Sequence, residues 1–194
     1  MNTPLLDGIM KVAQSNVLTH YRHSNESLIT PSLSELHTQD PAKAQEVLEK
    51  LIIRGRRTKD YLKWRAKTER MLRSRADKAG IQRETDYPIY ATYGGGGLFR
   101  GEETTKIPIA KVLENTTFTI GDSFPAMETR GTPGPDRRSR HGRKVYTYDQ
   151  IQELLREAGG LKKLKQQSID YDKGKGYIEA QIWKSQADLE RMFQ

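Results

Sequence analysis

The run from Tyr177 to Trp183 has the most regular strand pattern in the chain and constrains the fold more than any other segment. Apolar residues occupy the even positions of this run, and successive side chains of a β-strand point to opposite faces of a sheet. The odd positions carry Tyr177, Glu179, Gln181 and Trp183. The pattern therefore predicts a strand that places one carboxylate, Glu179, among aromatic and amide side chains on a single face.

The length and composition limit the size and class of the protein. A chain of 194 residues is long enough for one domain with a sizeable core. No apolar run approaches the roughly 18 residues that would span a bilayer, and residues 1–17 lack the pattern of a secretory signal. These features predict a soluble protein without a membrane segment, either cytoplasmic or secreted without a visible signal peptide.

Cysteine and histidine usage narrows the chemistry further. The absence of cysteine excludes disulfides, thiolate metal sites and cysteine nucleophiles. His20 and His23 lie three residues apart without an obvious third ligand, so no metal site is predicted. The net charge of +8 favours phosphate-bearing partners, either nucleic acid or a dinucleotide.

Residues 1–80 are predicted to form a mainly helical N-terminal part that also contains a short strand over 16–22. Asp40 is a good N-cap and Pro41 suits the first helical position, with apolar residues recurring at three and four thereafter. After a basic turn, Thr58 can cap a second helix that runs to about Ala79. One face of this second helix is almost wholly Arg and Lys.

Residues 81–194 are predicted to be rich in sheet, which makes residues 1–194 a single α+β domain. Strand-like runs occupy 87–93, 107–112, 116–120 and 177–183. The spacing from Thr147 to Gln150 predicts a capping box that starts a helix, which Gly159 and Gly160 end. Ser185 starts a short closing helix, and the glycines at 94–97 form a loop rather than a dinucleotide fingerprint.

Two segments concentrate positive charge: the helix over 54–75 and the loop over 130–144. Both can be solvated faces, which is the common role of such charge runs. Both can also grip phosphates. This second interpretation makes a non-catalytic nucleic-acid-binding protein the alternative to an enzyme.

Two short motifs resemble the paired signature of bacterial and phage-associated ADP-ribosyltransferase-like domains, which include polymorphic toxins and type III effectors. The first is Thr-Thr-Phe-Thr-Ile-Gly-Asp-Ser over 116–123, and the second is Tyr-Ile-Glu-Ala-Gln-Ile over 177–182. The segments 59–65 and 87–90 are also similar to the region before the first motif, so the likeness covers roughly residues 17–193. The resemblance implies a split antiparallel β-sheet with NAD, the substrate, between its halves.

The resemblance also assigns roles to individual residues in the arginine, serine, glutamate class of these enzymes. Arg22 with Tyr21 looks like the pair that holds the NAD phosphates, and His20 competes for that role. Ser123 matches the serine that orients the catalytic glutamate, with Thr119 as its substitute. Glu179 matches the catalytic glutamate itself. A carboxylate suits this role, because an oxocarbenium-like transition state needs a carboxylate near the sugar.

The implied activity is NAD-dependent mono-ADP-ribosyl transfer, a glycosyltransferase reaction typical of toxins and virulence effectors that act in the cytosol of a target cell. Tyr177 and Gln181 are expected to face the acceptor. Tyr177 stands where many protein-modifying members carry Glu or Gln, so the acceptor is left open as a protein or a nucleic acid. An immunity or antitoxin protein is the expected inhibitory partner, and an NAD glycohydrolase or a degenerate partner-binding member is a further alternative.

Overall fold

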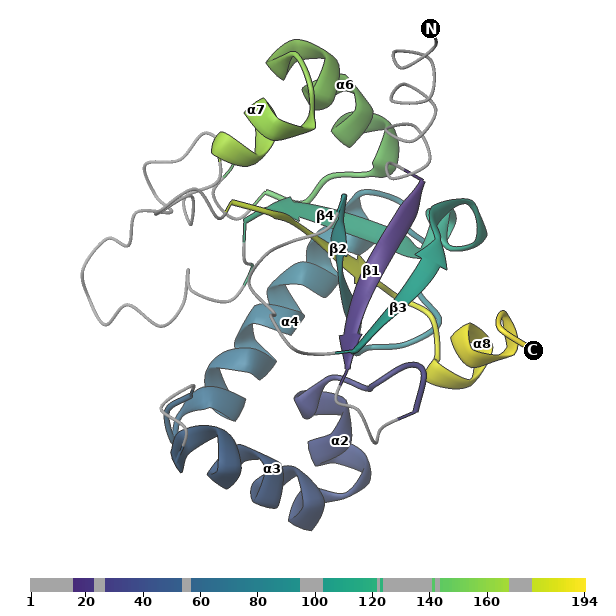
Figure 1. Cartoon of the computed structure of the whole chain (residues 1–194). Coiled ribbons are helices and arrows are strands. Elements are labelled where there is room, and N and C mark those ends of the chain that lie inside the picture. The colour runs from purple at the N-terminus through teal and green to yellow at the C-terminus, as the bar shows by residue number, and fades with distance from the viewer. Residues whose placement is uncertain are drawn as a thin grey trace, which may run out of the picture.

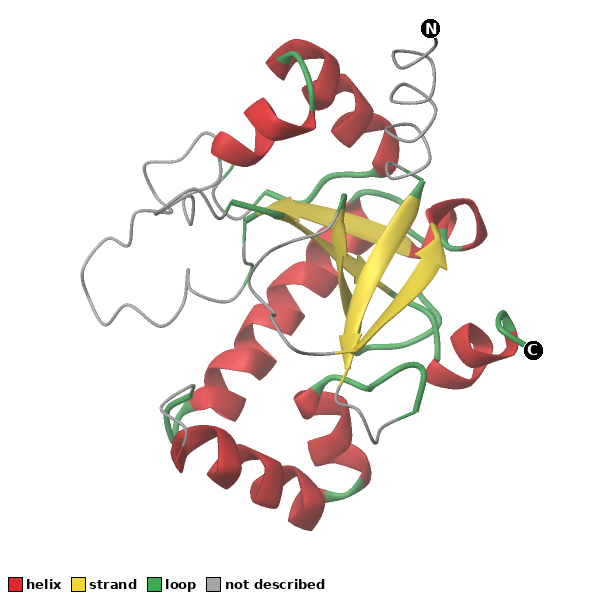
Figure 2. Ribbon diagram, in the orientation of Figure 1, coloured by secondary structure: helices red, strands yellow, loops and turns green. Residues whose placement is uncertain are grey.

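The computed structural model describes residues 16–22, 27–53, 57–94, 103–121, 123, 141, 144–167 and 176–194. Within these residues the protein has an α+β fold, in which a five-stranded antiparallel sheet lies between two groups of helices (Figures 1 and 2). The strand order is β3-β1-β2-β5-β4. The strands are β1 (Val17–Arg22), β2 (Ile89–Tyr93), β3 (Glu103–Pro108), β4 (Thr116–Ile120) and β5 (Ile178–Ile182).

The described residues contain six α-helices and two short 3₁₀ helices. The α-helices are α2 (Leu33–Gln39), α3 (Pro41–Ile53), α4 (Tyr61–Lys78), α6 (Tyr148–Ala158), α7 (Leu161–Gln166) and α8 (Gln186–Arg191). The 3₁₀ helices are η1 (Ile109–Lys111) and η2 (Leu113–Asn115). No helix of the described residues has the length and apolar character needed to cross a membrane.

The two ladders that β1 forms differ in length. β1 pairs with β3 over six register positions but with β2 over only two, Leu18 with Tyr93 and Thr19 with Thr92. β2 and β4 each pair with the central strand β5 over five positions. The pair β3-β1 is therefore joined to the triplet β2-β5-β4 by a short ladder near the end of β2.

The two faces of the sheet have different chemical character. One face holds the main apolar core, in which Leu18, Ala91, Phe118 and Ala180 pack with residues of α6, α7 and α8. The other face is covered by α4, whose Leu72 and Ala76 pack against Trp183. Because both faces of β4 and β5 are buried, the polar residues of these strands have to find their partners inside the protein.

Most predicted elements are confirmed. α3 begins at Pro41, β4 covers 116–120, α6 carries the predicted capping box at Thr147, and Ser185 caps α8. α4 begins at Tyr61, with Asp60 rather than Thr58 at the N-cap position. β5 shows the predicted alternation, with Ile178, Ala180 and Ile182 in the apolar core.

Three predictions need correction or completion. The strand expected over 107–112 is wrong, because β3 ends at Pro108, which lacks the N–H of a ladder, and the chain turns into η1. α2 and α7 were not predicted, since seven and six residues are too few for a clear helical repeat. Gly94 ends β2 with φ at 67°, whereas 95–97 and nearly all of 130–144 lie outside the described residues.

Thr147→Ala is expected to destabilise the fold by about 1 kcal/mol. The Thr147 side chain accepts from the backbone N–H of Gln150, and the Gln150 side chain accepts from the N–H of Thr147 in return, at 2.9 Å. Urea unfolding followed by circular dichroism measures the difference. Thr147→Ser keeps the hydroxyl and should stay close to the wild type, so an equal loss in both variants would contradict the capping role.

Candidate functional site

Glu179 belongs to a row of polar side chains that crosses the whole sheet. The register aligns Lys106, Thr19, Thr92, Glu179 and Thr119 on five adjacent strands, on the face opposite the apolar core. At the β3 end of the row, the Lys106 Nζ donates to the Thr19 hydroxyl at 2.7 Å. The face of the sheet opposite the apolar core thus carries a continuous polar strip through Glu179.

The Glu179 carboxylate is held by two hydrogen bonds to the same oxygen. The Ser123 hydroxyl donates to Oε1 at 2.5 Å, and the Gln181 amide donates to it at 2.8 Å. Glu179 is only 7% exposed, so solvent does not compete strongly for these donors. The structure therefore brings together Ser123 and Glu179, which are 56 residues apart in sequence.

Gln181 is in turn fixed by hydroxyl groups of β4. Its amide also donates to Thr119 at 3.0 Å, and its carbonyl oxygen accepts from Thr117 at 3.0 Å. The Trp183 indole N–H donates to Thr117 at 2.9 Å, which extends the network to the end of β5. A chain of satisfied buried hydrogen bonds of this kind fixes the carboxylate in one orientation.

A cavity of about 210 Å³ opens beside Glu179 where β1 and β2 stop pairing. It is lined by His20, Tyr21, Thr30, Pro31, Ser32, Tyr90, Ala91, Thr92, Tyr177 and Glu179. Four residues predicted for the site, His20, Tyr21, Tyr177 and Glu179, therefore share one cavity. Among the described residues, the buried Thr92 hydroxyl has no hydrogen-bond partner, so this cavity wall offers a polar group to a ligand.

His20 is held by the backbone on both sides of its ring. The N–H of Thr30 donates to Nε2 at 3.0 Å, so Nε2 is the acceptor and Nδ1 carries the proton that it donates to the Tyr90 carbonyl at 2.8 Å. Because both nitrogens are engaged, His20 supports the wall between β1 and β2. The structure thus assigns it to the cavity, with its ring nitrogens directed at the protein.

Arg22 is placed differently from the other predicted residues. It forms an ion pair with Glu103, its register partner on β3, and it is not among the residues that line the cavity. Its role as the clamp for the NAD phosphates stays a prediction.

Thr119, Gln181 and Tyr177 all lie inside the protein. Thr119 donates to the Gly121 carbonyl at 3.1 Å and accepts from Gln181, so it belongs to the network and not to the cavity lining. Gln181 was expected to face an acceptor but is fully buried, because its amide is used to hold Glu179. Tyr177 lines the cavity, and its carbonyl accepts from the Gly121 N–H at 2.9 Å, which supports the turn towards Ser123.

A buried charged cluster under this site was missed by the sequence analysis. Arg65, expected on a solvated cationic face, is only 8% exposed and pairs with Glu69 at 2.9 Å. Its guanidinium lies 3.7 Å from the ring centroid of Tyr90, and the Tyr90 hydroxyl donates to Glu69 at 3.2 Å. The spacing of four residues between Arg65 and Glu69 was the signal that could have indicated the pair.

Arg65 and Tyr90 of this cluster interact electrostatically with the carboxylate of Glu179. Burial opposes the charge of Arg65, but the neighbouring Tyr90, Tyr61, Glu69 and Glu179 raise its pKa above the ordinary value. Burial, together with Glu69 and Glu179, likewise raises the pKa of Tyr90, against the opposing effect of Arg65. Arg65 therefore stays cationic and Tyr90 stays neutral, next to Glu179.

Glu35→Gln is expected to stabilise the protein at neutral pH more than at acidic pH. Burial, followed by repulsion from Glu69, raises the pKa of Glu35 in the folded state. A carboxyl with a raised folded pKa favours folding when protonated, and this contribution is lost as the pH rises through that pKa. Urea unfolding of both proteins across the acidic to neutral range tests this. A stability difference that shrinks with rising pH would contradict it.

No family model, curated protein or solved structure matches the chain.

Proposed function

We propose that the chain is an NAD-dependent mono-ADP-ribosyltransferase of the arginine, serine, glutamate class. The observation that carries the proposal is the 2.5 Å hydrogen bond from Ser123 to Glu179. These residues come from the two separate motifs on which the resemblance rests, and the pairing is the one that the resemblance implies. A serine that orients a carboxylate beside a cavity suits a reaction with a cationic sugar transition state.

In the proposed reaction, the bond between the ribose and nicotinamide of NAD breaks, and its electron pair leaves with nicotinamide. A nucleophile of the acceptor forms the new bond to the same ribose carbon and releases its proton to water. Glu179 would accept a hydrogen bond from a ribose hydroxyl and stabilise the positive charge that develops on the sugar. Ser123 and Gln181 would hold the carboxylate in place, so little reorganisation is needed as the charge appears.

Several features of the cavity suit one end of NAD. The unpartnered Thr92 hydroxyl offers a hydrogen bond, and Tyr21 and Tyr177 offer aromatic surface for a flat ring. A volume of about 210 Å³ is below the range of roughly 300–1,000 Å³ usual for larger ligands, so the cavity would take the nicotinamide and ribose alone. Arg22, at the end of β1, would hold the phosphates outside it after exchanging its bond with Glu103.

The short ladder between β1 and β2 supports the split-sheet form of the fold that the proposal requires. The further biological role rests on the resemblance alone: a toxin or effector that acts in the cytosol of a target cell and is restrained by an immunity or antitoxin protein.

Incubating the protein with NAD labelled on the adenine half, with and without cell extract, tests the proposal. Release of nicotinamide together with label on a macromolecule is the expected result. Free ADP-ribose as the sole labelled product would identify a glycohydrolase instead. Intact NAD under all conditions would contradict both reactions and leave the partner-binding alternative.

A further inference from the structure

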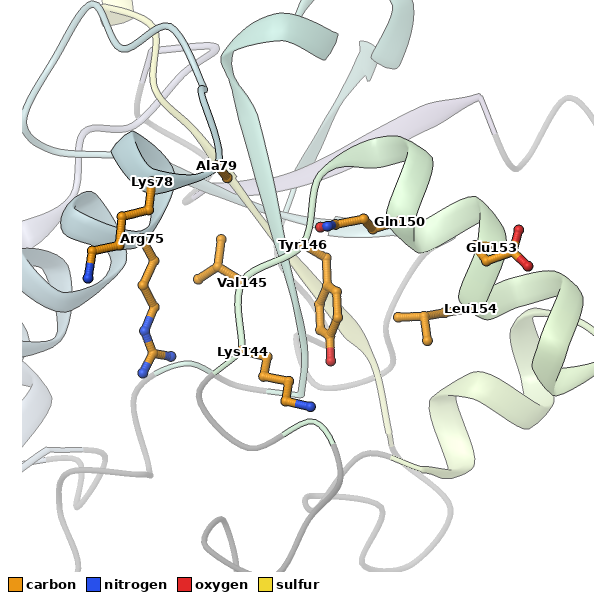
Figure 3. Close-up of a pocket in the computed structure, with 9 residues that line it drawn as sticks. All are labelled: Arg75, Lys78, Ala79, Lys144, Val145, Tyr146, Gln150, Glu153 and Leu154. Carbon is orange, nitrogen blue, oxygen red and sulfur yellow. The ribbon is translucent and has the colours of Figure 1, made fainter.

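A second and larger cavity lies away from Glu179, between the C-terminal end of α4 and the start of α6. Its volume is about 650 Å³, within the range of roughly 300–1,000 Å³ that receives ligands (Figure 3). Residues 144–146 form its floor, with α4 on one side and α6 on the other. We call it the α4–α6 groove; its lining is Arg75, Lys78, Ala79, Lys144, Val145, Tyr146, Gln150, Glu153 and Leu154.

The groove carries positive charge that is not neutralised within it. Among the described residues, Lys78 and Lys144 form no ion pair, and both are exposed. The single carboxylate of the lining, Glu153, is already paired with Arg156. The groove therefore attracts anions.

The cations on another side of α4, in contrast, form ion pairs. Arg73 pairs with Asp86 at 2.8 Å, and Arg83 beyond the helix pairs with Asp77 and with Asp86. Charge neutralisation is thus complete near 83–86 and absent at Lys78. At the C-terminal end of α4, the groove side therefore keeps a cation available for an anionic partner, whereas the side near 83–86 does not.

The floor of the groove adds an aromatic and apolar component. Tyr146 lies between Val145 and Leu154, and its backbone pairs with Phe118, so the ring stands on the edge of the sheet beside β4. The His141 ring bonds to the Tyr146 hydroxyl at 2.9 Å, which restricts the ring. A fixed aromatic ring in the same groove as exposed lysines is suited to stacking on a base while the lysines contact the phosphates of a single strand.

We propose that the α4–α6 groove binds single-stranded nucleic acid, with Lys78 and Lys144 contacting phosphates and Tyr146 stacking on a base. Arg75 lies next to Lys78 on the helix surface and adds to the positive charge of the groove. The bound strand would be the acceptor of ADP-ribose; this last step rests on the proposed function, whereas binding does not. An acidic peptide lacks the planar bases for which the tyrosine ring is suited.

Binding is tested with the Glu179→Gln protein, so that transfer does not consume the probe. Fluorescence anisotropy follows a labelled single-stranded DNA of about 12 nucleotides, a length within the site sizes of such surfaces. Lys78→Glu/Lys144→Glu is expected to weaken binding at least about tenfold, and Lys78→Gln/Lys144→Gln is expected to lower the slope of log K against log salt by about 1.4, at roughly 0.7 per lost contact. Tyr146→Leu should weaken binding by about fivefold or more.

The matched control is Lys43→Glu/Lys59→Glu, which makes the same change of net charge at exposed positions on α3 and just before α4. It should stay within about twofold of the parent, since only distant charge is altered. Thermal melting shows whether each variant folds. If Lys78→Glu/Lys144→Glu does not fold, the loss of binding is measured with Lys78→Gln/Lys144→Gln instead.

Several outcomes would overturn the inference. These are equal losses in the control and the groove variants, no binding by the parent, tighter binding of a Glu-rich peptide through the same lysines, or competition by NAD for the groove. Nicotinamide release is measured separately, so a failure of binding leaves the proposed chemistry standing and a failure of chemistry leaves the groove standing.

Discussion

Glu179→Gln is expected to release nicotinamide from NAD roughly 10²–10³-fold more slowly than the wild type. The substitution keeps an oxygen that can accept from Ser123 and Gln181, which now donate to Oε1 at 2.5 and 2.8 Å. It removes the negative charge that would stabilise the cationic sugar. The loss should therefore fall mainly on kcat, with the fold and the affinity for NAD largely kept.

Glu114→Gln is the matched control, because Glu114 is an exposed carboxylate in η2 away from the cavity lining. Its turnover should equal that of the wild type. Ser123→Ala should give a smaller loss than Glu179→Gln, since it removes one of two donors to Oε1 and not the charge. Turnover that persists in Glu179→Gln would contradict the assignment of the catalytic carboxylate.

Arg65→Met is expected to cost about 3–5 kcal/mol of folding free energy. It leaves the Glu69 carboxylate, whose side chain is 3% exposed, without the guanidinium that compensates for its burial. The stacking of Arg65 on the Tyr90 ring is lost as well. Chemical denaturation of the two proteins at neutral pH measures the difference.

The double variant Arg65→Met/Glu69→Leu distinguishes a charge effect from loss of packing. Because it removes both buried charges, it should recover most of the stability that Arg65→Met loses. Lys67→Met is the control, since Lys67 lies on the same helix and is exposed. A double variant as unstable as the single one would show that the loss comes from packing and not from an uncompensated buried charge.

The sequence predicted which strand carries the site residues, but it did not predict how deeply their side chains are buried. The alternation over 177–183 correctly separated Ile178, Ala180 and Ile182 from Glu179 and Gln181, because a strand enforces that separation. Alternation alone does not reveal that α4 covers the polar face. For this reason Gln181 was expected at an acceptor surface, whereas it lies in a buried network with Thr117 and Thr119.

Local sequence patterns could not predict the contacts between residues that are far apart in the chain. Arg65 stands in a helix rich in Arg and Lys, and only the approach of Tyr90 from a strand 25 positions later distinguishes it from its neighbours. The short ladder between β1 and β2, which opens the cavity, is likewise a property of strand order and register. The end of β3, in contrast, was predictable from the sequence. A proline lacks the N–H that a strand ladder needs, so Pro108 marks where this strand ends.

A crystal structure of the Glu179→Gln protein with intact NAD tests the central claim most directly. The proposal predicts the nicotinamide and its ribose in the cavity beside Thr92 and Tyr177, with a ribose hydroxyl at about 2.7–3.2 Å from the side chain at position 179. NAD bound only in the α4–α6 groove, or in the cavity with its ribose turned away from position 179, would contradict it.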